Sequence, residues 1–228
     1  MDIKDVIFSL RLFFNRRVKT FMDENGYWSI EGLTDIHGKL YRLPYDTKLL
    51  SACLEIQIVS NLMDWAKRHG WELQFPEHQN YYPDVTLIKN KWTFALDVKT
   101  TYRIDGNPAM CNGFTLGTYQ AYFRDRIKGS NIHLPYKSYD GHVVLGVIYT
   151  RGEYLRDLDI IIQEKWKIAG DKPGSGNTKN MGSIRVIEDL VHGRGPFVSY
   201  GQRIFDLYWM NYPICKRLSE FIYAYREL

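Results

Sequence analysis

The spacing of apolar residues predicts helices in two parts of the N-terminal half of the chain. Apolar positions three, four and seven residues apart run through residues 2–23, which is the pattern of one helix face. A longer helix is predicted from the N-cap signal at Asp46 to His69, because Gly70 is a typical helix end. Between these helices, residues 26–43 mix β-branched and aromatic residues with glycines, which predicts a hairpin or small set of strands.

The segment YPDVTLIKNKWTFALDVKTTY, residues 82–102, alternates in the way of β-strands. It predicts two strands joined by a polar turn at KNK. In the second strand a period of two places Asp97 and Lys99 on one face, together with Ala95. The opposite face is apolar and consists of Phe94, Leu96 and Val98.

The rest of the chain adds further strands and helices. WELQF predicts a short strand, and the strongly apolar run at 143–150 predicts a strand at the centre of a sheet. Residues 154–169 have no clear pattern, and the Gly/Asn/Thr-rich residues 170–182 predict a loop. GQRIFDLYWMNY and KRLSEFIYAYREL are amphipathic and predict helices. This mixture indicates the α/β (α+β) class.

Length and composition indicate one globular unit, residues 1–228. A net charge of +4 permits a polyanionic partner without requiring one. The three cysteines, Cys53, Cys111 and Cys215, lack zinc or redox spacing, which indicates a reducing cytosol and no structural zinc. The N-terminus is unlike a signal peptide and no run of about 18 apolar residues occurs, so a cytoplasmic protein without membrane contact is expected.

The two aspartates of the strand pair form a candidate metal site. If the turn sets the register correctly, Asp84 and Asp97 approach each other across the hairpin. Their repulsion is relieved by a divalent cation, and hard oxygen ligands favour Mg²⁺. Lys99 could then orient or deprotonate a water and offset charge at a reacting phosphate. The alternative is a surface salt bridge between Lys99 and one carboxylate.

Glu55 on the long helix is a further candidate for this site. Its neighbours three, four and seven residues away are apolar, so its carboxylate should find a cation or become protonated. The alternative is a glutamate at the edge of the apolar stripe, exposed on the helix surface.

The order Glu55, Asp84 and Asp97-x-Lys99 resembles the core of the PD-(D/E)xK nuclease superfamily. The neighbouring segments are more specific and resemble, from about residue 26 to 184, segments of the EcoRV family of type II restriction endonucleases. These segments are DTKLLS, KRHGW, QNYYPDVTL, LDVKTTY, FTLGTY, YTR and KWKIAGDKPGSGNTKNMGSI. The resemblance implies a restriction-endonuclease-like core, in which helices flank a mixed central sheet, with a small dimerisation hairpin and DNA-recognition loops.

The resemblance also implies an activity. It is that of a Mg²⁺-dependent homodimer that cuts double-stranded DNA at a short palindrome to blunt ends with 5′-phosphates. The similarity of the recognition loop implies the outer bases of 5′-GATATC or a close relative. A cognate DNA methyltransferase is implied in the same host, without a stable complex.

Residue roles follow from the same resemblance. Asp84 and Asp97 would be the main metal ligands, Lys99 the catalytic lysine and Glu55 a secondary acidic residue at the metal. About 26–43 would be a dimerisation sub-lobe, about 46–150 the catalytic core and about 165–228 a DNA-recognition sub-lobe. The implied DNA contacts are Thr47, Lys48, Gln79, Asn80, Thr100, Thr101, Tyr102, Gly174, Ser175, Gly176, Asn177, Thr178, Lys179 and Asn180.

Alternatives stay open on the residues alone. A repair or junction nuclease could use the same core on structured DNA, and a DNA-binding protein could keep an inactive core. The Gly-rich loop could also be a plain flexible loop or a phosphate cradle, although no G-x-x-x-x-G-K-[ST] pattern is present.

Overall fold

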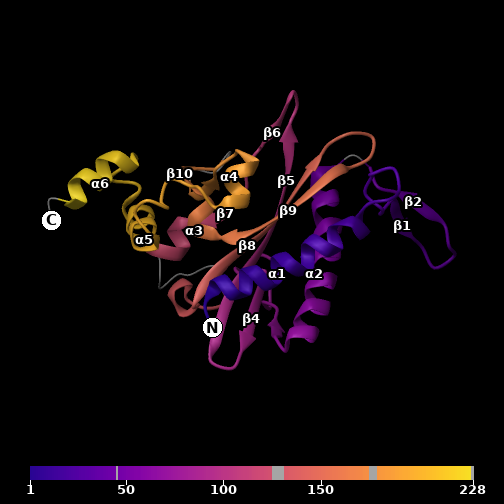
Figure 1. The fold of residues 1–228 in the computed structure, drawn as a ribbon, viewed down its shortest axis with the longest axis horizontal. Helices are drawn as coiled ribbons and strands as arrows, with labels where there is room; N and C mark the ends of the chain where they lie inside the picture. The colour runs from indigo at the N-terminus through magenta and orange to yellow at the C-terminus, as the bar shows by residue number, and fades with distance from the viewer. Residues whose placement is uncertain (45, 125–130, 175–178, 227–228) are drawn as a thin grey trace.

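A mixed β-sheet forms the centre of the protein (Figure 1). The computed structural model describes residues 1–44, 46–124, 131–174 and 179–226. Within them the strand order is β3-β4-β5-β8-β9, with β6 paired to the end of β5, and only β5 and β8 are parallel. The strands are β3 (Glu72–Gln74), β4 (Val85–Lys89), β5 (Trp92–Ile104), β6 (Asn107–Cys111), β8 (Gly141–Thr150) and β9 (Arg156–Glu164). The predicted mixed sheet, with 143–150 at its centre, is confirmed.

The hairpin of β4 and β5 has the predicted tight turn. Lys89 pairs with Trp92, and Asn90 takes the positive φ of 56° that such a turn needs. At the other end Val85 pairs with Leu96. One residue further along, the same register sets Asp84 opposite the next residue of β5, which carries the second carboxylate.

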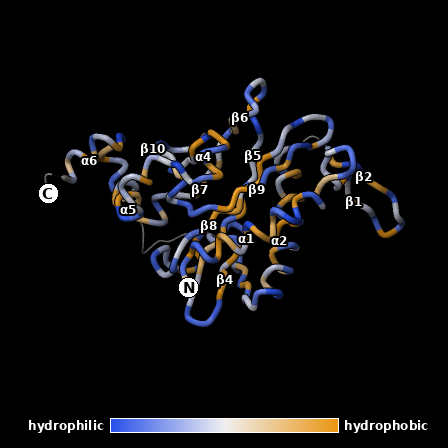
Figure 2. The backbone as a smooth tube through the Cα atoms, viewed as in Figure 1, coloured by the Kyte–Doolittle hydropathy of each residue, from blue (hydrophilic) through white to orange (hydrophobic). Residues whose placement is uncertain are grey.

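Among the described residues, the two helices that the apolar pattern predicted cover one face of the sheet. α1 (Ile3–Arg17) packs against β9, and α2 (Thr47–His69) packs against β3 and β5. A short 3₁₀ helix, η1 (Val18–Phe21), follows α1. Their apolar stripes join the strand side chains in one buried cluster, which includes Leu10, Phe14, Leu54, Leu62, Phe94, Leu96 and Val98. Figure 2 shows this apolar centre along α1, α2 and β8. No helix in the described part of the chain is both long and apolar enough to cross a membrane.

Replacing Asp46 with alanine is expected to lower the free energy of unfolding by about 1 kcal/mol. Its carboxylate accepts hydrogen bonds from the backbone N–H groups of Lys48 and Leu49, both at 3.0 Å, at the start of α2. These groups have no partner within the helix, so alanine leaves them to water. Urea denaturation checks the prediction. Asp46→Asn serves as control, because it keeps the acceptor and should lose much less.

The other face of the sheet is covered by the C-terminal half of the chain. A small sheet of order β10-β11-β7 lies there, and the described residues of this half add four helices and two short helical turns. These elements are β7 (Thr115–Thr118), η2 (Gln120–Arg124), η3 (Tyr136–Ser138), α3 (Lys165–Ile168), β10 (Ala169–Pro173), β11 (Asn180–Ser183), α4 (Ile187–His192), α5 (Gln202–Asn211) and α6 (Leu218–Arg226). A second buried cluster fills this side and contains Ala95 of β5. The central sheet is therefore buried on both faces.

The predicted loop at 170–182 is partly wrong. Residues at both of its ends form strands, and β11 pairs with both β10 and β7. Asn180, for example, pairs with Thr118, far away in the sequence. These strands are rich in Gly and polar residues, so neither apolar alternation nor β-propensity marks them. Pairing with each other and, for β11, with β7 stabilises them instead.

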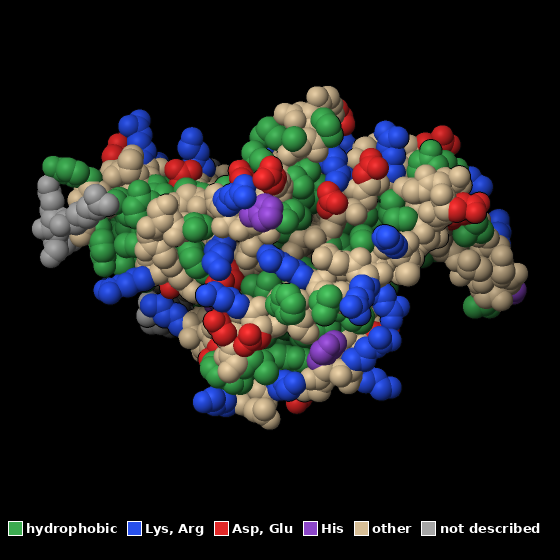
Figure 3. Space-filling model, viewed as in Figure 1, with side chains coloured by type: hydrophobic (Ala, Val, Ile, Leu, Met, Phe, Trp, Pro, Cys, Tyr) green, Lys and Arg blue, Asp and Glu red, His purple; other side chains and the backbone are tan. Residues whose placement is uncertain are grey.

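A small hairpin of β1 (Gly32–Thr34) and β2 (Leu40–Arg42) projects from one end of the molecule, at the right of Figure 1. It confirms the hairpin predicted within residues 26–43. Its tip is open to solvent, and the side chain of Ile36 is 96% exposed. On the face seen in Figure 3, acidic and basic side chains are interspersed, in keeping with the small net charge.

Candidate active site

Asp84, Asp97 and Lys99 converge at the open end of the β4–β5 hairpin. The ammonium of Lys99 lies 2.7 Å from Oδ1 of Asp97 and 3.3 Å from Oδ2 of Asp84. Oδ2 of Asp84 also accepts a hydrogen bond of 2.7 Å from the backbone N–H of Val98. Lys99 therefore stands between two carboxylates, and it is not the partner of a single exposed carboxylate.

The surroundings of Asp84 and Asp97 shift the pKa values of the two carboxyl groups in opposite directions. Burial and the negative charge of Asp97 raise the pKa of Asp84 to about 7. Burial acts in the same direction on Asp97, which is only 2% exposed, but Lys99 and Lys165 outweigh it and its pKa is lowered. Asp97 is thus the permanent anion of the pair, and Asp84 is the carboxyl that exchanges a proton near neutral pH.

Lys99 is held as a cation in the free protein. Burial alone would lower its pKa, but Asp97 and Asp84 outweigh burial and raise it. An ammonium of this kind donates hydrogen bonds and offsets negative charge, and it has no lone pair with which to accept a proton.

A second lysine, which the sequence interpretation missed, lies on the other side of Asp97. Lys165 is fully buried, and its ammonium lies 3.4 Å from Oδ2 of Asp97. Burial lowers the pKa of Lys165 to about 8, although Asp97 acts to raise it. Lys165 comes from α3, far from the hairpin in sequence, so no local spacing connects it with Asp97.

Glu55 does not join the two aspartates in one ligand set. In the described part of the chain, no group of three or more His, Cys, Asp or Glu side chains could hold a metal ion. Glu55 instead lines a pocket beside Lys99, where burial raises its pKa and Lys99 acts to lower it. It is near the centre electrostatically, in a half-exposed position on α2.

The pocket beside Lys99, which we call the Lys99 pocket, has a volume of about 540 Å³. Predicted DNA contacts from three separate segments line it, namely Thr47, Lys48, Gln79, Thr100, Thr101 and Tyr102. The hydroxyl of Thr100 donates a hydrogen bond of 2.6 Å to Oγ of Ser51, which ties β5 to α2. Thr101 is only 5% exposed, so its side chain has little contact with solvent in the free protein.

A second hollow lies on the carboxylate side of Lys99. Gln79 and Asn80 line it together with Asp84, Asp97 and Asn180. The loop before β4 and the start of β11 thus open onto the same space as the carboxylates.

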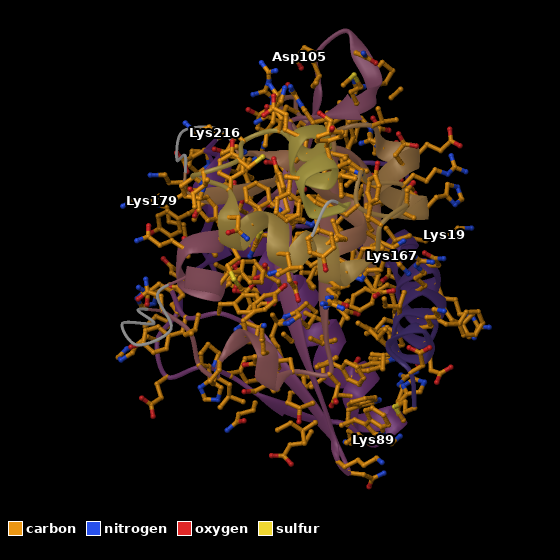
Figure 4. All side chains as sticks on the ribbon, turned by 90° about the vertical axis from the view of Figure 1, so that its left-hand side faces the viewer. Lys19, Lys89, Asp105, Lys167, Lys179 and Lys216 are labelled. Carbon is orange, nitrogen blue, oxygen red and sulfur yellow. The ribbon has the colours of Figure 1, made fainter. Side chains whose placement is uncertain are left out.

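The two ends of the predicted recognition loop are joined to each other. The backbone N–H of Gly174 donates a hydrogen bond of 2.9 Å to the carbonyl of Asn180, which closes the base of the loop. Lys179 is exposed and lies at the edge of the molecule in Figure 4. Ser175, Gly176, Asn177 and Thr178 lie outside the described residues.

Comparison with known proteins gives this site a family. The family model described as restriction endonuclease EcoRV matches residues 24–228. The chain is 36% identical over 219 residues to the type II restriction enzyme EcoRV of Escherichia coli, and the match covers 86% of each protein. This chain belongs to the EcoRV family of restriction endonucleases. It is therefore a type II restriction endonuclease, a hydrolase that acts on DNA, and its mixed sheet flanked by helices is the fold expected of the family.

Restriction endonucleases of the EcoRV family are generally metal-dependent, and the residues at the hairpin end fit a metal ion. Oδ2 of Asp97 is buried and accepts no hydrogen bond from the described residues, because the ammonium of Lys165, at 3.4 Å, is an ion-pair partner only. Asp84 and Asp97 offer carboxylate oxygens, the donors that hard divalent cations prefer. Two carboxylates suffice for Mg²⁺, which keeps several waters and uses substrate phosphates as further ligands. Asp84 and Asp97 are the residues that would hold the ion.

Metal binding to the free protein is expected to weaken below about pH 7. A proton then occupies Asp84, whose pKa is raised to about 7, and a cation has to displace it. The apparent affinity for Mn²⁺ should fall by up to about tenfold per pH unit below about 7 and stay level above it. Calorimetric titration at several pH values checks this. Asp84→Asn should bind weakly without such a step, and a pH-independent native affinity would contradict the prediction.

Proposed function

We propose that this EcoRV-family enzyme uses Mg²⁺ to cut both DNA strands within a short palindrome, 5′-GATATC or a close relative. The products would be blunt ends with 5′-phosphates and 3′-hydroxyls. The observation that carries the proposal is the convergence of Asp84, Asp97 and Lys99 at one end of the hairpin. A site that had lost its chemistry would not need two carboxylates and a lysine in one partly buried place.

Asp84 and Asp97 hold the metal, and Glu55 acts from the Lys99 pocket as a secondary acidic group. A bound divalent cation would supply positive charge next to the reacting phosphate and lower the pKa of water. Lys99 contributes a further positive charge at the developing negative charge of the phosphate. Its raised pKa favours this electrostatic role over that of a general base.

DNA contacts are proposed at two places. Thr47, Lys48, Thr100, Thr101 and Tyr102 would position the backbone, because they line the Lys99 pocket around the catalytic lysine. Gln79 and Asn80 would meet the minor groove. The loop of Gly174, Ser175, Gly176, Asn177, Thr178, Lys179 and Asn180 would read base edges in the major groove. The central step would be read through DNA deformability.

The assembly is proposed as a homodimer, since a palindrome is matched by a two-fold axis. Residues of about 26–43 would form the dimerisation sub-lobe, and the exposed side chains of Leu33, Ile36, Leu40 and Tyr41 supply apolar surface for it. About 46–150 would be the catalytic core and about 165–228 the recognition sub-lobe. A host methyltransferase that protects the same DNA site, and a cytoplasmic location, stay predictions.

Digestion of plasmid DNA with Mg²⁺, followed by sequencing of the ends, tests the proposal. Discrete fragments with blunt ends at one hexanucleotide are expected. Cleavage confined to junctions or other structured DNA would instead indicate a repair nuclease. Specific binding without cleavage would contradict the catalytic assignment.

A further inference from the structure

Lys165 has no place in the roles assigned above, yet it lies against the carboxylate at their centre. It is the first residue of α3, directly after β9, and its side chain is fully buried. Its ammonium lies 3.4 Å from Oδ2 of Asp97, an ion pair longer than a normal hydrogen bond. Burying a lysine costs free energy, so this position needs a compensating partner.

An aromatic cage holds this ammonium in place. It lies 3.8 Å from the ring centroid of Tyr82, 5.1 Å from that of Tyr122 and 5.9 Å from that of Tyr136, within the range of cation–π attraction. His142 braces the cage, because it stacks on Tyr136 at 3.6 Å and shares a hydrogen bond of 2.7 Å with the hydroxyl of Tyr82. Rings on several sides leave Lys165 little freedom to move.

The two lysines form ion pairs with different oxygens of the Asp97 carboxylate. Lys99 pairs with Oδ1 and Lys165 with Oδ2. The side chain of Lys99 is a quarter exposed and can turn toward a bound phosphate, whereas that of Lys165 is enclosed and remains beside Asp97. When all four groups are ionised, the two lysines and the carboxylates of Asp84 and Asp97 carry no net charge together.

We infer that Lys165 is a positioning residue of this centre. It fixes the orientation of the Asp97 carboxylate from the side opposite Lys99 and offsets its negative charge. The inference rests on the proposed role of Asp97 as a metal ligand. Loss of Lys165 then changes metal binding, which loss of a purely structural residue would not. Without Lys165 the site carries one more net negative charge and attracts a divalent cation more strongly. The carboxylate, however, loses its fixed orientation, and cleavage slows.

Lys165→Met tests this inference, because methionine fills a similar volume without the charge. Mn²⁺ alone is titrated into the DNA-free protein by calorimetry, and single-turnover cleavage of plasmid DNA is measured at saturating Mn²⁺. We expect binding at least about tenfold tighter together with cleavage about tenfold slower. Lys167→Met is the matched control. Lys167 lies two residues away, is 23% exposed, pairs with Glu164 and is labelled in Figure 4, and its change should leave both measurements unaltered.

The outcomes separate the inference from the proposed function. If the native protein binds Mn²⁺ and cleaves DNA but Lys165→Met binds Mn²⁺ equally or more weakly, the role of Lys165 is overturned and the proposed function stands. Absence of Mn²⁺ binding by the native protein would instead overturn the metal centre, and the inference with it.

If Lys165→Met folds poorly, the inference is tested by comparing the thermal stabilities of four forms of the protein. Melting temperatures of the native protein, Lys165→Met, Asp97→Asn and the double variant form a double-mutant cycle. If Lys165 serves Asp97, the double variant should recover most of the melting temperature lost in Lys165→Met, since no buried carboxylate is then left without its partner. A double variant that loses the sum of the two single losses would overturn the inference.

Discussion

Replacing Asp97 with asparagine is expected to slow DNA cleavage by roughly 10²–10³-fold, the scale of losing one preorganised group at a reacting phosphate. Asp97 is the most buried carboxylate of the centre, and both of its oxygens face lysines. The lowered pKa keeps Asp97 ionised, whereas Asp84, with a pKa of about 7, does not supply the same permanent charge. Asparagine keeps the shape but removes this charge, and a divalent cation then keeps a single carboxylate ligand of the pair.

Single-turnover cleavage of a plasmid, with fluorescence anisotropy for DNA binding, measures this effect. Binding in the absence of metal should change little, because the affinity comes mainly from contacts to the DNA backbone. Asp64→Asn is the control. It makes the same chemical change on α2, where the side chain is 57% exposed and pairs only loosely with Arg17 at 3.6 Å. Near-native cleavage by Asp97→Asn would remove Asp97 from the catalytic machinery.

Elements with strong local signals could be predicted from the sequence. Asp46 and Gly70 mark the ends of α2 through a side-chain cap and a positive φ of 68°, and both effects are local. The turn between β4 and β5 could be predicted as well, and the structure supplies the register that the sequence left as a condition. That register is what joins Asp84 to Asp97, so the core of the candidate site followed from one hairpin.

The remainder depends on contacts between distant segments. β11 exists because it pairs with β7, and its sequence carries little preference for a strand. Lys165 reads as an ordinary surface lysine in EKWK, and only the tyrosine cage and Asp97 make its burial possible. The apolar stripe of α2 suggested a place for Glu55 beside the aspartates, but the helix sets it in the neighbouring pocket.

Replacing Lys99 with methionine is expected to slow cleavage by about 10²–10³-fold and to strengthen metal binding. Lys99 is the shared cation of Asp84 and Asp97, at 3.3 Å and 2.7 Å, so its loss leaves more negative charge for a divalent ion. The same loss removes a positive charge from the reacting phosphate. Calorimetry with Mn²⁺ and single-turnover cleavage measure the two effects separately, and Lys67→Met on the exposed side of α2 should alter neither.

Lys99→Arg distinguishes the electrostatic role from proton transfer. Arginine keeps the positive charge but does not act as a base in proteins. If charge is what Lys99 supplies, Lys99→Arg should retain more activity than Lys99→Met, with a similar dependence on pH. Equal inactivity of the two variants, with metal and DNA binding intact, would point to proton transfer by a neutral lysine. The raised pKa of Lys99 in the free protein argues for the first result, because both carboxylates hold the proton on its amine.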